Sequence, residues 1–303
     1  MATKKATKTI VSNLQEDSGK EKLGYVVWWA LERVMRVVED RVKKIFTKYG
    51  FDEKEFPEVC SSEVAFTRAL SRAKRDKLLD KWLIRKIFLG DDKIVYGIVK
   101  EKIDKDNEDL DYKKEDKITL KRKTEDIQLE NNTPQGQLVK KFYGELRGIL
   151  DNYHLMVFLL QQVKVMNALQ LRDTGGIYFL PIQYEERVLR IEKALAELSP
   201  ESTICLLPIY KDDRAKKSLT MSFDENFQAE LEAKADELKK RIESEGTRAS
   251  TFNNRLNEFK ELRQKAQVYE DLLNFKAGGI HKKIGELEQK VKKALMSATM
   301  DVE

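Results

Sequence analysis

Residues 169–181 read LQLRDTGGIYFLP, and this stretch joins a helical pattern to a short strand. Apolar residues lead into a charged turn that contains the pair Gly175–Gly176. Glycine adopts the left-handed conformation that ends helices and forms tight turns, so we expect a helix stop here. The β-prone run Ile177–Leu180 then enters a small sheet, and Pro181 closes it because proline donates no backbone hydrogen bond.

The segments around this turn predict a winged-helix-like domain over residues 137–215. Residues 137–171 carry apolar side chains at helical spacing, enough for two or three helices. Residues 184–198 predict a further helix, and residues 202–210 predict a buried strand. Helices followed by a turn and a short aromatic strand have the helix, helix, wing order of that domain.

The N-terminal part predicts a tail followed by a domain of helices and strands. Residues 1–20 are polar and aperiodic, which is typical of a mobile tail. Residues 21–130 form the expected α+β domain. Its aromatic run Tyr25–Trp29 is β-prone, and apolar positions that recur every three or four residues from Leu31 predict an amphipathic helix.

A second helix is expected over residues 61–76, because Ser61 or Ser62 can cap it and apolar side chains such as Phe66 fall on one face. The alternating pattern of residues 81–104 predicts a hairpin. Residues 116–130 predict one or two more strands of a β-meander. Residues 131–136, NNTPQG, have the composition of a linker.

The C-terminal part, residues 219–303, predicts helices only. Apolar residues recur every three or four positions after Phe223, with interruptions at Gly246 and at Gly278–Gly279. This pattern indicates an antiparallel coiled-coil hairpin with a short third helix, whose apolar positions could also join copies into a homo-oligomer. The expected fold class is therefore α+β: a small N-terminal helix plus β-meander, a winged-helix-like middle and a C-terminal helical hairpin.

The charged residues are abundant but nearly balanced. Among 303 residues, 57 are Lys or Arg and 52 are Asp or Glu, for a net charge of +5, which permits nucleic-acid contact without requiring it. No run reaches about 18 apolar residues, so we expect no membrane span. Cys60 and Cys205 lie too far apart for a disulfide framework, which favours a reduced, cytoplasmic protein.

The sequence shows no pattern typical of a metal site or a catalytic centre. Residues 104–115 place acidic side chains at several positions of a calcium loop, but Asp109 stands where that loop requires glycine. His154 and His281 are scattered and give no zinc spacing. No nucleophile elbow, phosphate loop or dinucleotide fingerprint is present. We therefore predict a non-enzymatic protein without a metal or cofactor.

The most concentrated basic surface lies on the predicted second helix. Arg68, Arg72 and Arg75 fall on the face opposite its apolar side chains. A guanidinium group matches the geometry of phosphate oxygens, so this stripe is a candidate for phosphate contact. A solvated charged face is the alternative explanation.

Two smaller basic clusters support the same hypothesis. Lys164 and Arg172 flank the expected wing, and Lys121–Lys123 forms a third cluster. If these surfaces bind phosphates together with the arginine stripe, the partner is a nucleic acid, with DNA favoured over RNA. The other hypothesis is a protein-interaction, scaffold or inhibitor role in which the helical hairpin contacts a protein partner.

Four segments carry a resemblance to known sequences: GYVVWW (24–29), FTRALSRA (66–73), LRDTGGIYFLP (171–181) and YEERVLRIEKALAEL (184–198). Together they resemble an uncharacterised family that occurs in bacteria, archaea and their viruses or mobile elements. The resemblance covers most of the chain up to about residue 240. It implies a domain of unknown function without an assigned catalytic residue, and a role around mobile elements such as defence, counter-defence or replication.

Overall fold

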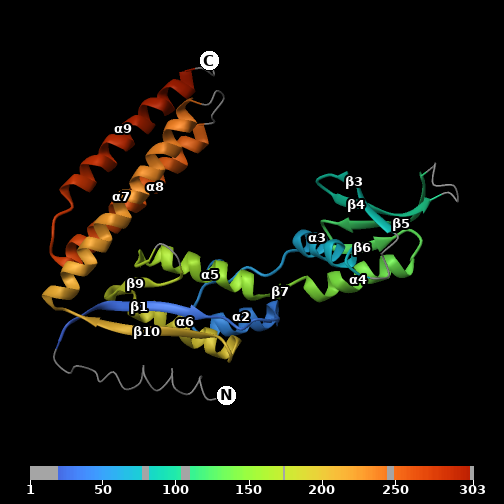
Figure 1. Ribbon diagram of the computed structural model, residues 1–303, viewed down its shortest axis with the longest axis horizontal. Helices are drawn as coiled ribbons and strands as arrows, with labels where there is room; N and C mark the ends of the chain where they lie inside the picture. Colours follow the sequence, from blue (N-terminus) through green and yellow to red (C-terminus); the bar gives the residue numbers. More distant parts are fainter. Residues whose placement is uncertain (1–19, 77–81, 104–109, 173–174, 244–248, 301–303) are drawn as a thin grey trace. The chain divides into compact units, whose positions relative to one another are not determined.

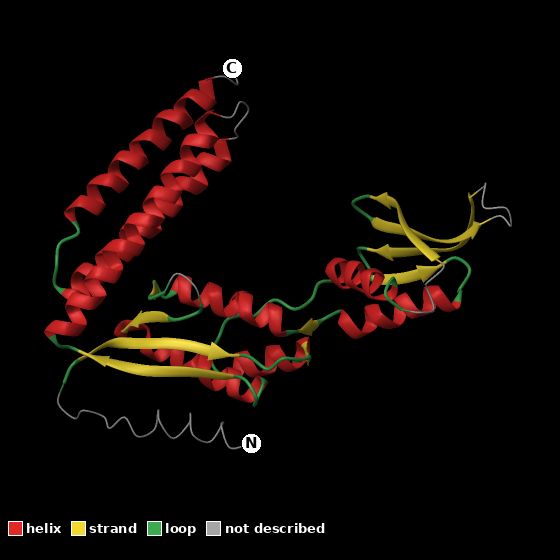
Figure 2. Cartoon of the chain, in the orientation of Figure 1, coloured by secondary structure: helices red, strands yellow, loops and turns green. Residues whose placement is uncertain are grey.

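A computed structural model of the chain describes residues 20–76, 82–103, 110–172, 175–243 and 249–300 (Figures 1 and 2). These residues form a mixture of helices and antiparallel sheets, which confirms the α+β class. The chain divides into two compact units. Unit 1 comprises residues 1–30, 160–196 and 200–303, and unit 2 comprises residues 31–159 and 197–199. The tail expected over residues 1–20 lies outside the described residues except for Lys20.

Unit 2 contains an antiparallel sheet whose described strands follow the order β3-β4-β5-β6. The strands are β3 (Trp82–Leu89), β4 (Lys93–Ile103), β5 (Leu110–Lys121) and β6 (Asp126–Leu129). The first two form the hairpin that the alternating pattern predicts. Helices α3 (Ser62–Ala73) and α4 (Pro134–Leu146) lie side by side on one face of this sheet (Figure 1).

The core between this sheet and its two helices follows from the alternation of side chains along each strand. Ile84, Ile98 and Ile118 point toward the helices and pack with Phe66 of α3, which is fully buried. Ser61 accepts a hydrogen bond from the backbone N–H of Val64, so α3 begins where the sequence predicts. The opposite face of the sheet carries the residues between these core positions.

The start of the first helix differs from the sequence prediction. The helix expected from Leu31 begins at Glu39 instead, as α2 (Glu39–Lys48). Just before it, β2 (Val37–Val38) pairs with β7 (Ile149–Leu150). Val34, which the helical spacing assigned to the buried stripe, has an exposed fraction of 74%. Backbone pairing with a distant segment therefore overrides the local helical pattern. A 3-10 turn, η1 (Glu53–Glu55), follows α2.

The expected linker 131–136 is partly wrong, because α4 starts at Pro134. Thr133 caps this helix by accepting a hydrogen bond from the backbone N–H of Gly136 at 3.2 Å. Proline is tolerated in the first turn of a helix, where its missing N–H would have no partner anyway. A turn-rich composition therefore marks the start of a helix here.

Unit 1 contains a second antiparallel sheet with the described order β10-β1-β9-β8. Its strands are β1 (Lys22–Ala30), β8 (Leu169–Gln170), β9 (Tyr178–Pro181) and β10 (Thr203–Tyr210). Gly175 has a left-handed φ of 98°, as the sequence predicts for the turn before β9. The winged-helix arrangement is not supported, because β9 lies between β1 and β8 rather than projecting as a wing. The strand pairing joins segments about 150 residues apart, which local order does not reveal.

Helices complete both units. They are α5 (Asn152–Val165), the 3-10 turn η3 (Ile182–Tyr184), α6 (Glu185–Leu198), α7 (Asp213–Glu243), α8 (Ala249–Leu273) and α9 (Gly278–Met300). Within the described residues, α7, α8 and α9 form a three-helix bundle (Figure 2). The third helix is therefore not short. Gly278 and Gly279 open α9, and the break precedes them, where Asn274 has a φ of 54°. The interruption expected at Gly246 lies outside the described residues.

Candidate functional site

The face of the β3–β6 sheet that points away from α3 and α4 is the candidate site, and we call it the outer face. Val95 lies between Ile94 and Tyr96, which contact the core, so its side chain points to the outer face. Residues paired across antiparallel strands share a face. The pairing register therefore defines which side chains stand beside Val95.

One row of residues crosses all four described strands through Val95. Phe88 pairs with Val95, Val95 with Thr119, and Thr119 with Gln128. The row has no charged side chain, and we call it the central row. Phe88 stands at its β3 end with 45% of its surface exposed. A β-bulge between Lys86 and Phe88 shifts the register of β3 and brings Phe88 opposite Val95.

Basic side chains flank the central row on both sides. On one side Lys93 pairs with Lys121. On the other side Arg85 pairs with Gly97, which pairs with Lys117. Lys93 and Gly97 are four residues apart on β4, so the two basic rows stand about 13 Å apart at about 3.3 Å per residue.

An open hollow of about 610 Å³ lies over the central row. Its basic and apolar walls include Lys93, Lys117, Lys121, Phe88 and Ile87. Hydrogen-bonding groups for its floor come from the Thr119 and Gln128 side chains of the central row. The hollow is open to solvent rather than enclosed. The hollow therefore offers cations, an aromatic ring and neutral polar groups to one ligand, and the Glu130 carboxylate also lines it.

Acidic side chains stand at the β6 end of both basic rows. Asp126 pairs with Lys121. Glu130 lies 2.6 Å from Lys114 Nζ and 3.9 Å from Lys117 Nζ. The hydrogen bond from Lys114 is the largest influence on Glu130 and lowers the pKa of that carboxyl. Within the three described rows and Glu130, four cations stand against two carboxylates, so the outer face keeps a positive excess toward β3 and β4.

A buried carboxylate on β5 holds the loop that follows β6 in place. Asp116 is fully buried and accepts backbone hydrogen bonds from Glu130 at 3.1 Å, Asn131 at 2.9 Å and Thr133 at 3.0 Å. Burial alone would raise the pKa of Asp116, but these hydrogen bonds outweigh it and lower the pKa. Asp116 thereby fixes the loop that follows β6.

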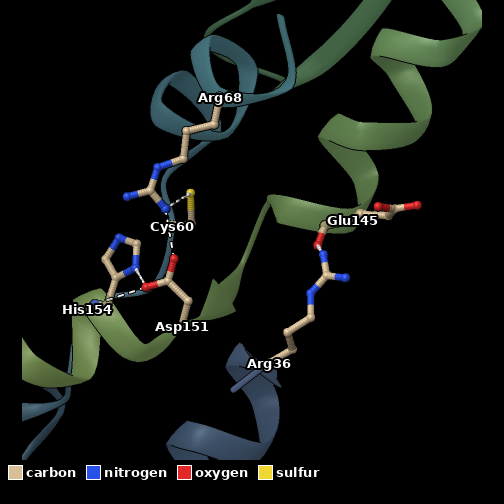
Figure 3. A network of polar contacts seen from close by, with 6 residues as sticks. All are labelled: Arg36, Cys60, Arg68, Glu145, Asp151 and His154. Carbon is tan, nitrogen blue, oxygen red and sulfur yellow. Dashed lines mark hydrogen bonds and ion pairs between the residues drawn. The ribbon is translucent and has the colours of Figure 1, made fainter. Parts of the chain in front are cut away.

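The arginine stripe predicted on α3 is largely engaged by carboxylates, and Figure 3 shows the contacts of Arg68. Arg68 donates to Asp151 Oδ2 at 2.8 Å, and Asp151 Oδ1 in turn accepts from the backbone and from Nδ1 of His154. Arg72 forms an ion pair with Glu145 at 2.8 Å. The charges of Arg68 and Arg72 are therefore already matched within unit 2.

Arg36 completes the contacts drawn in Figure 3, since its guanidinium donates to the backbone carbonyl of Glu145 at 2.6 Å. The nearby Cys60 thiol lies 4.0 Å from the guanidinium of Arg68. Burial raises the pKa of the Cys60 thiol, which keeps it protonated and a poor nucleophile. The contacts of Arg68, Asp151 and His154 join α3 to the start of α5.

The remaining predicted contact residues are divided between the two units. Arg75 is exposed at the end of α3 in unit 2. Lys164 and Arg172 belong to unit 1, where Lys164 lies 3.9 Å from Glu261. In the third cluster, Lys121 lines the hollow, whereas Arg122 forms an ion pair with Glu63 at 2.7 Å.

Sequence reasoning missed most of the outer face. Lys93 and Lys117 alternate with core residues of β4 and β5, a signal that is visible in the printed sequence. Alternation alone says which residues share a face of one strand. It does not say that Phe88 of one strand will stand in line with Thr119 and Gln128 of others.

A family model of proteins of unknown function matches residues 22–300, nearly the whole chain. The chain belongs to this family, DUF6744. No curated protein and no solved structure matches it. Membership in DUF6744 confirms the resemblance to an uncharacterised family and assigns no activity to the outer face.

The described part of this DUF6744 chain also bears on metals and membranes. Among the described residues, no group of three or more His, Cys, Asp or Glu side chains could hold a metal ion. Much of the calcium-like loop 104–115 lies outside the described residues. None of the described helices is long and apolar enough to cross a membrane. Cys60 and Cys205 are both free thiols.

Proposed function

We propose that this protein binds nucleic acid, and that the outer face of the β3–β6 sheet is its binding surface. The single observation that supports this proposal is the pair of basic rows, Lys93–Lys121 and Arg85–Lys117, on either side of the neutral central row. Lysine and arginine side chains bind phosphates, and neutral side chains between them leave room for sugars and bases. The proposal moves the contact surface from the helix α3 stripe to the sheet.

Salt dependence tests this proposal directly. Each phosphate that a cation contacts releases counterions, so affinity falls as salt rises, with a slope set by the number of contacts. We expect full-length protein to bind fluorescent DNA probes measured by anisotropy, and the Lys93→Gln/Lys121→Gln double variant to reduce the slope by about 1.4 on a single strand.

Lys44→Gln is the matched control, because Lys44 is an exposed cation on α2 that does not line the hollow. It should leave both the affinity and the salt slope unchanged. If the double variant and the control behave alike, or if no DNA or RNA probe binds at low salt, the outer face is not a nucleic-acid surface. Arg68→Gln and Arg72→Gln would then show whether the α3 stripe contributes.

In this proposal the protein acts by binding alone, without a cofactor, and it acts inside the cell. DNA is the first ligand to test. The free thiols of Cys60 and Cys205 fit a reducing compartment. A role around mobile elements, such as defence or replication, fits a binding protein of this kind. Capture of bound DNA from cells that carry the protein would identify the elements concerned.

A second candidate function is protein interaction through the helical bundle. The heptad residues expected to join copies, such as Leu238 and Leu262, are buried inside the bundle itself. Met221 and Ile242 of α7 are instead 55% and 46% exposed. At 100° per residue they lie about 60° apart on the helix, so they share one side. Light scattering on the protein and on the Met221→Lys/Ile242→Lys variant tests self-association. This candidate function predicts that the protein is a dimer and that the variant is a monomer.

A further inference from the structure

The proposed nucleic-acid site has a feature that phosphate contact alone does not need. Phe88 and Ile87, with exposed fractions of 45% and 56%, stand at the β3 end of the hollow beside Lys93. The Lys93 ammonium lies over one face of the Phe88 ring, 5.7 Å from its centre, which leaves the other face for a base. An exposed aromatic ring beside a cation is the combination that binds an unstacked base and its phosphate together.

The shape of the hollow points the same way. It has a volume of about 610 Å³ and is open to solvent, so a nucleotide can reach its floor. The bases of a duplex are stacked on one another, and their faces cannot reach an aromatic side chain. A splayed nucleotide can place its base on Phe88 while its phosphates meet the lysines.

The central row supplies partners for such a base. Thr119 and Gln128 are cross-strand neighbours on the outer face, and both line the hollow with Phe88. Their hydroxyl and amide groups can donate and accept hydrogen bonds at a base edge. The basic rows on either side, about 13 Å apart, leave Phe88, Thr119 and Gln128 of the central row accessible, whereas Val95 is buried.

We infer that the outer face binds single-stranded nucleic acid, with one base stacked on Phe88 above the central row and phosphates held by Lys93, Lys117 and Lys121. This inference rests on the proposed function, and it specifies the form of the ligand. Salt-dependent binding of a duplex would satisfy the proposed function but not this inference.

The test compares three probes of about 15 nucleotides with the full-length protein: a mixed-sequence single strand, the same strand as a duplex, and an abasic single strand. We expect the single strand to bind at least tenfold more tightly than either other probe. Phe88→Ala should weaken single-strand binding about tenfold, bring it close to the abasic strand, and leave the salt slope unchanged.

Two variants separate stacking from other causes. Phe88→Tyr keeps the ring and should restore single-strand affinity to within about twofold. Tyr153→Ala removes an aromatic side chain that is 56% exposed on α5 and does not line the hollow, so it should have no effect. Circular dichroism of each variant confirms that the fold is intact.

The outcomes distinguish the two proposals. If duplex and abasic probes bind as tightly as the single strand, or if Phe88→Ala has no effect, the single-strand inference is overturned while nucleic-acid binding stands. If none of the probes binds, both proposals fail. Preference for the single strand that Phe88→Ala removes and Phe88→Tyr restores supports both.

Discussion

The Thr133 hydroxyl donates a 2.7 Å hydrogen bond to Oδ2 of Asp116, which joins β5 to the N-cap of α4. The same carboxylate accepts backbone N–H groups from the loop that follows β6, including those of Glu130 and Asn131. One buried side chain therefore connects the β3–β6 sheet to helix α4, which packs against it. Removing that side chain should affect both.

Asp116→Ala should lower the free energy of unfolding by about 3 kcal/mol, because the variant leaves several buried donors without an acceptor. Urea denaturation of the full-length protein followed by circular dichroism measures the change. Asp92→Asn, in the exposed turn between β3 and β4, is the control and should change it by less than about 0.5 kcal/mol. A loss for Asp116→Ala no larger than that of the control would contradict this role.

The stability of the protein should decrease when the pH falls below about 4. The pKa values of Asp116 and Asp151 are lowered in the folded protein, in each case because hydrogen bonds outweigh the effect of burial. Such carboxyls stabilise the fold fully above the unfolded pKa of about 3.9, and this contribution is lost as pH falls through the lower folded pKa. The urea concentration at the unfolding midpoint should therefore stay constant above about pH 4 and decrease at lower pH. Asp116→Ala/Asp151→Ala should show a weaker dependence, and an unchanged dependence would refute the assignment.

Arg68 should matter for stability more than for nucleic-acid binding, because its guanidinium is engaged by Asp151 at 2.8 Å. We expect Arg68→Gln to cost about 1 kcal/mol of unfolding free energy, the upper range for a partly exposed ion pair, and to change DNA affinity less than twofold. Urea denaturation and anisotropy provide the two readouts. A tenfold loss of affinity with unchanged stability would return the contact surface to α3.

Tyr269 connects the helical bundle to the sheet of unit 1. Its ring is fully buried and stacks on Phe223 with centroids 4.9 Å apart, and its hydroxyl donates to the carbonyl of Asn167 at 3.0 Å. Tyr269→Phe should cost about 1 kcal/mol, because a carbonyl loses its donor. Phe223→Ala should cost about 4 kcal/mol by leaving a cavity. Thermal unfolding gives both values, and equal losses for the two variants would contradict this division.

The two cysteines should differ in reactivity toward a thiol reagent. Cys60 has 2% of its surface exposed, whereas Cys205 on β10 is partly exposed. Burial raises the pKa of both thiols, so both react slowly in the native protein. Cys205 should react first at pH 8, and Cys60 only as the protein unfolds. Mass spectrometry of the labelled peptides measures which cysteine reacts first. If Cys60 is labelled before Cys205, the surroundings of Cys60 open readily.

Local sequence determined the type of most elements and the faces of their side chains. The alternation in residues 93–98 and 116–121 places isoleucines inward and lysines outward, because successive side chains of a strand point to opposite faces. Ser61 before an amphipathic stretch determined the start of α3, because a serine oxygen can satisfy a free N–H at a helix end. These outcomes depend only on backbone geometry and neighbouring residues.

Tertiary structure decided which distant segments meet. Pairing with Leu150 turned Val37 into a strand residue, and pairing with β1 made β9 an inner strand. The partner of Arg68 lies 83 residues away, so helical periodicity could place the guanidinium on a face but not show that Asp151 neutralises it. The line of Phe88 with Thr119 across three strands likewise follows from strand register. Register depends on the whole set of contacts that the chain can bury at once, and no single stretch of sequence contains that information.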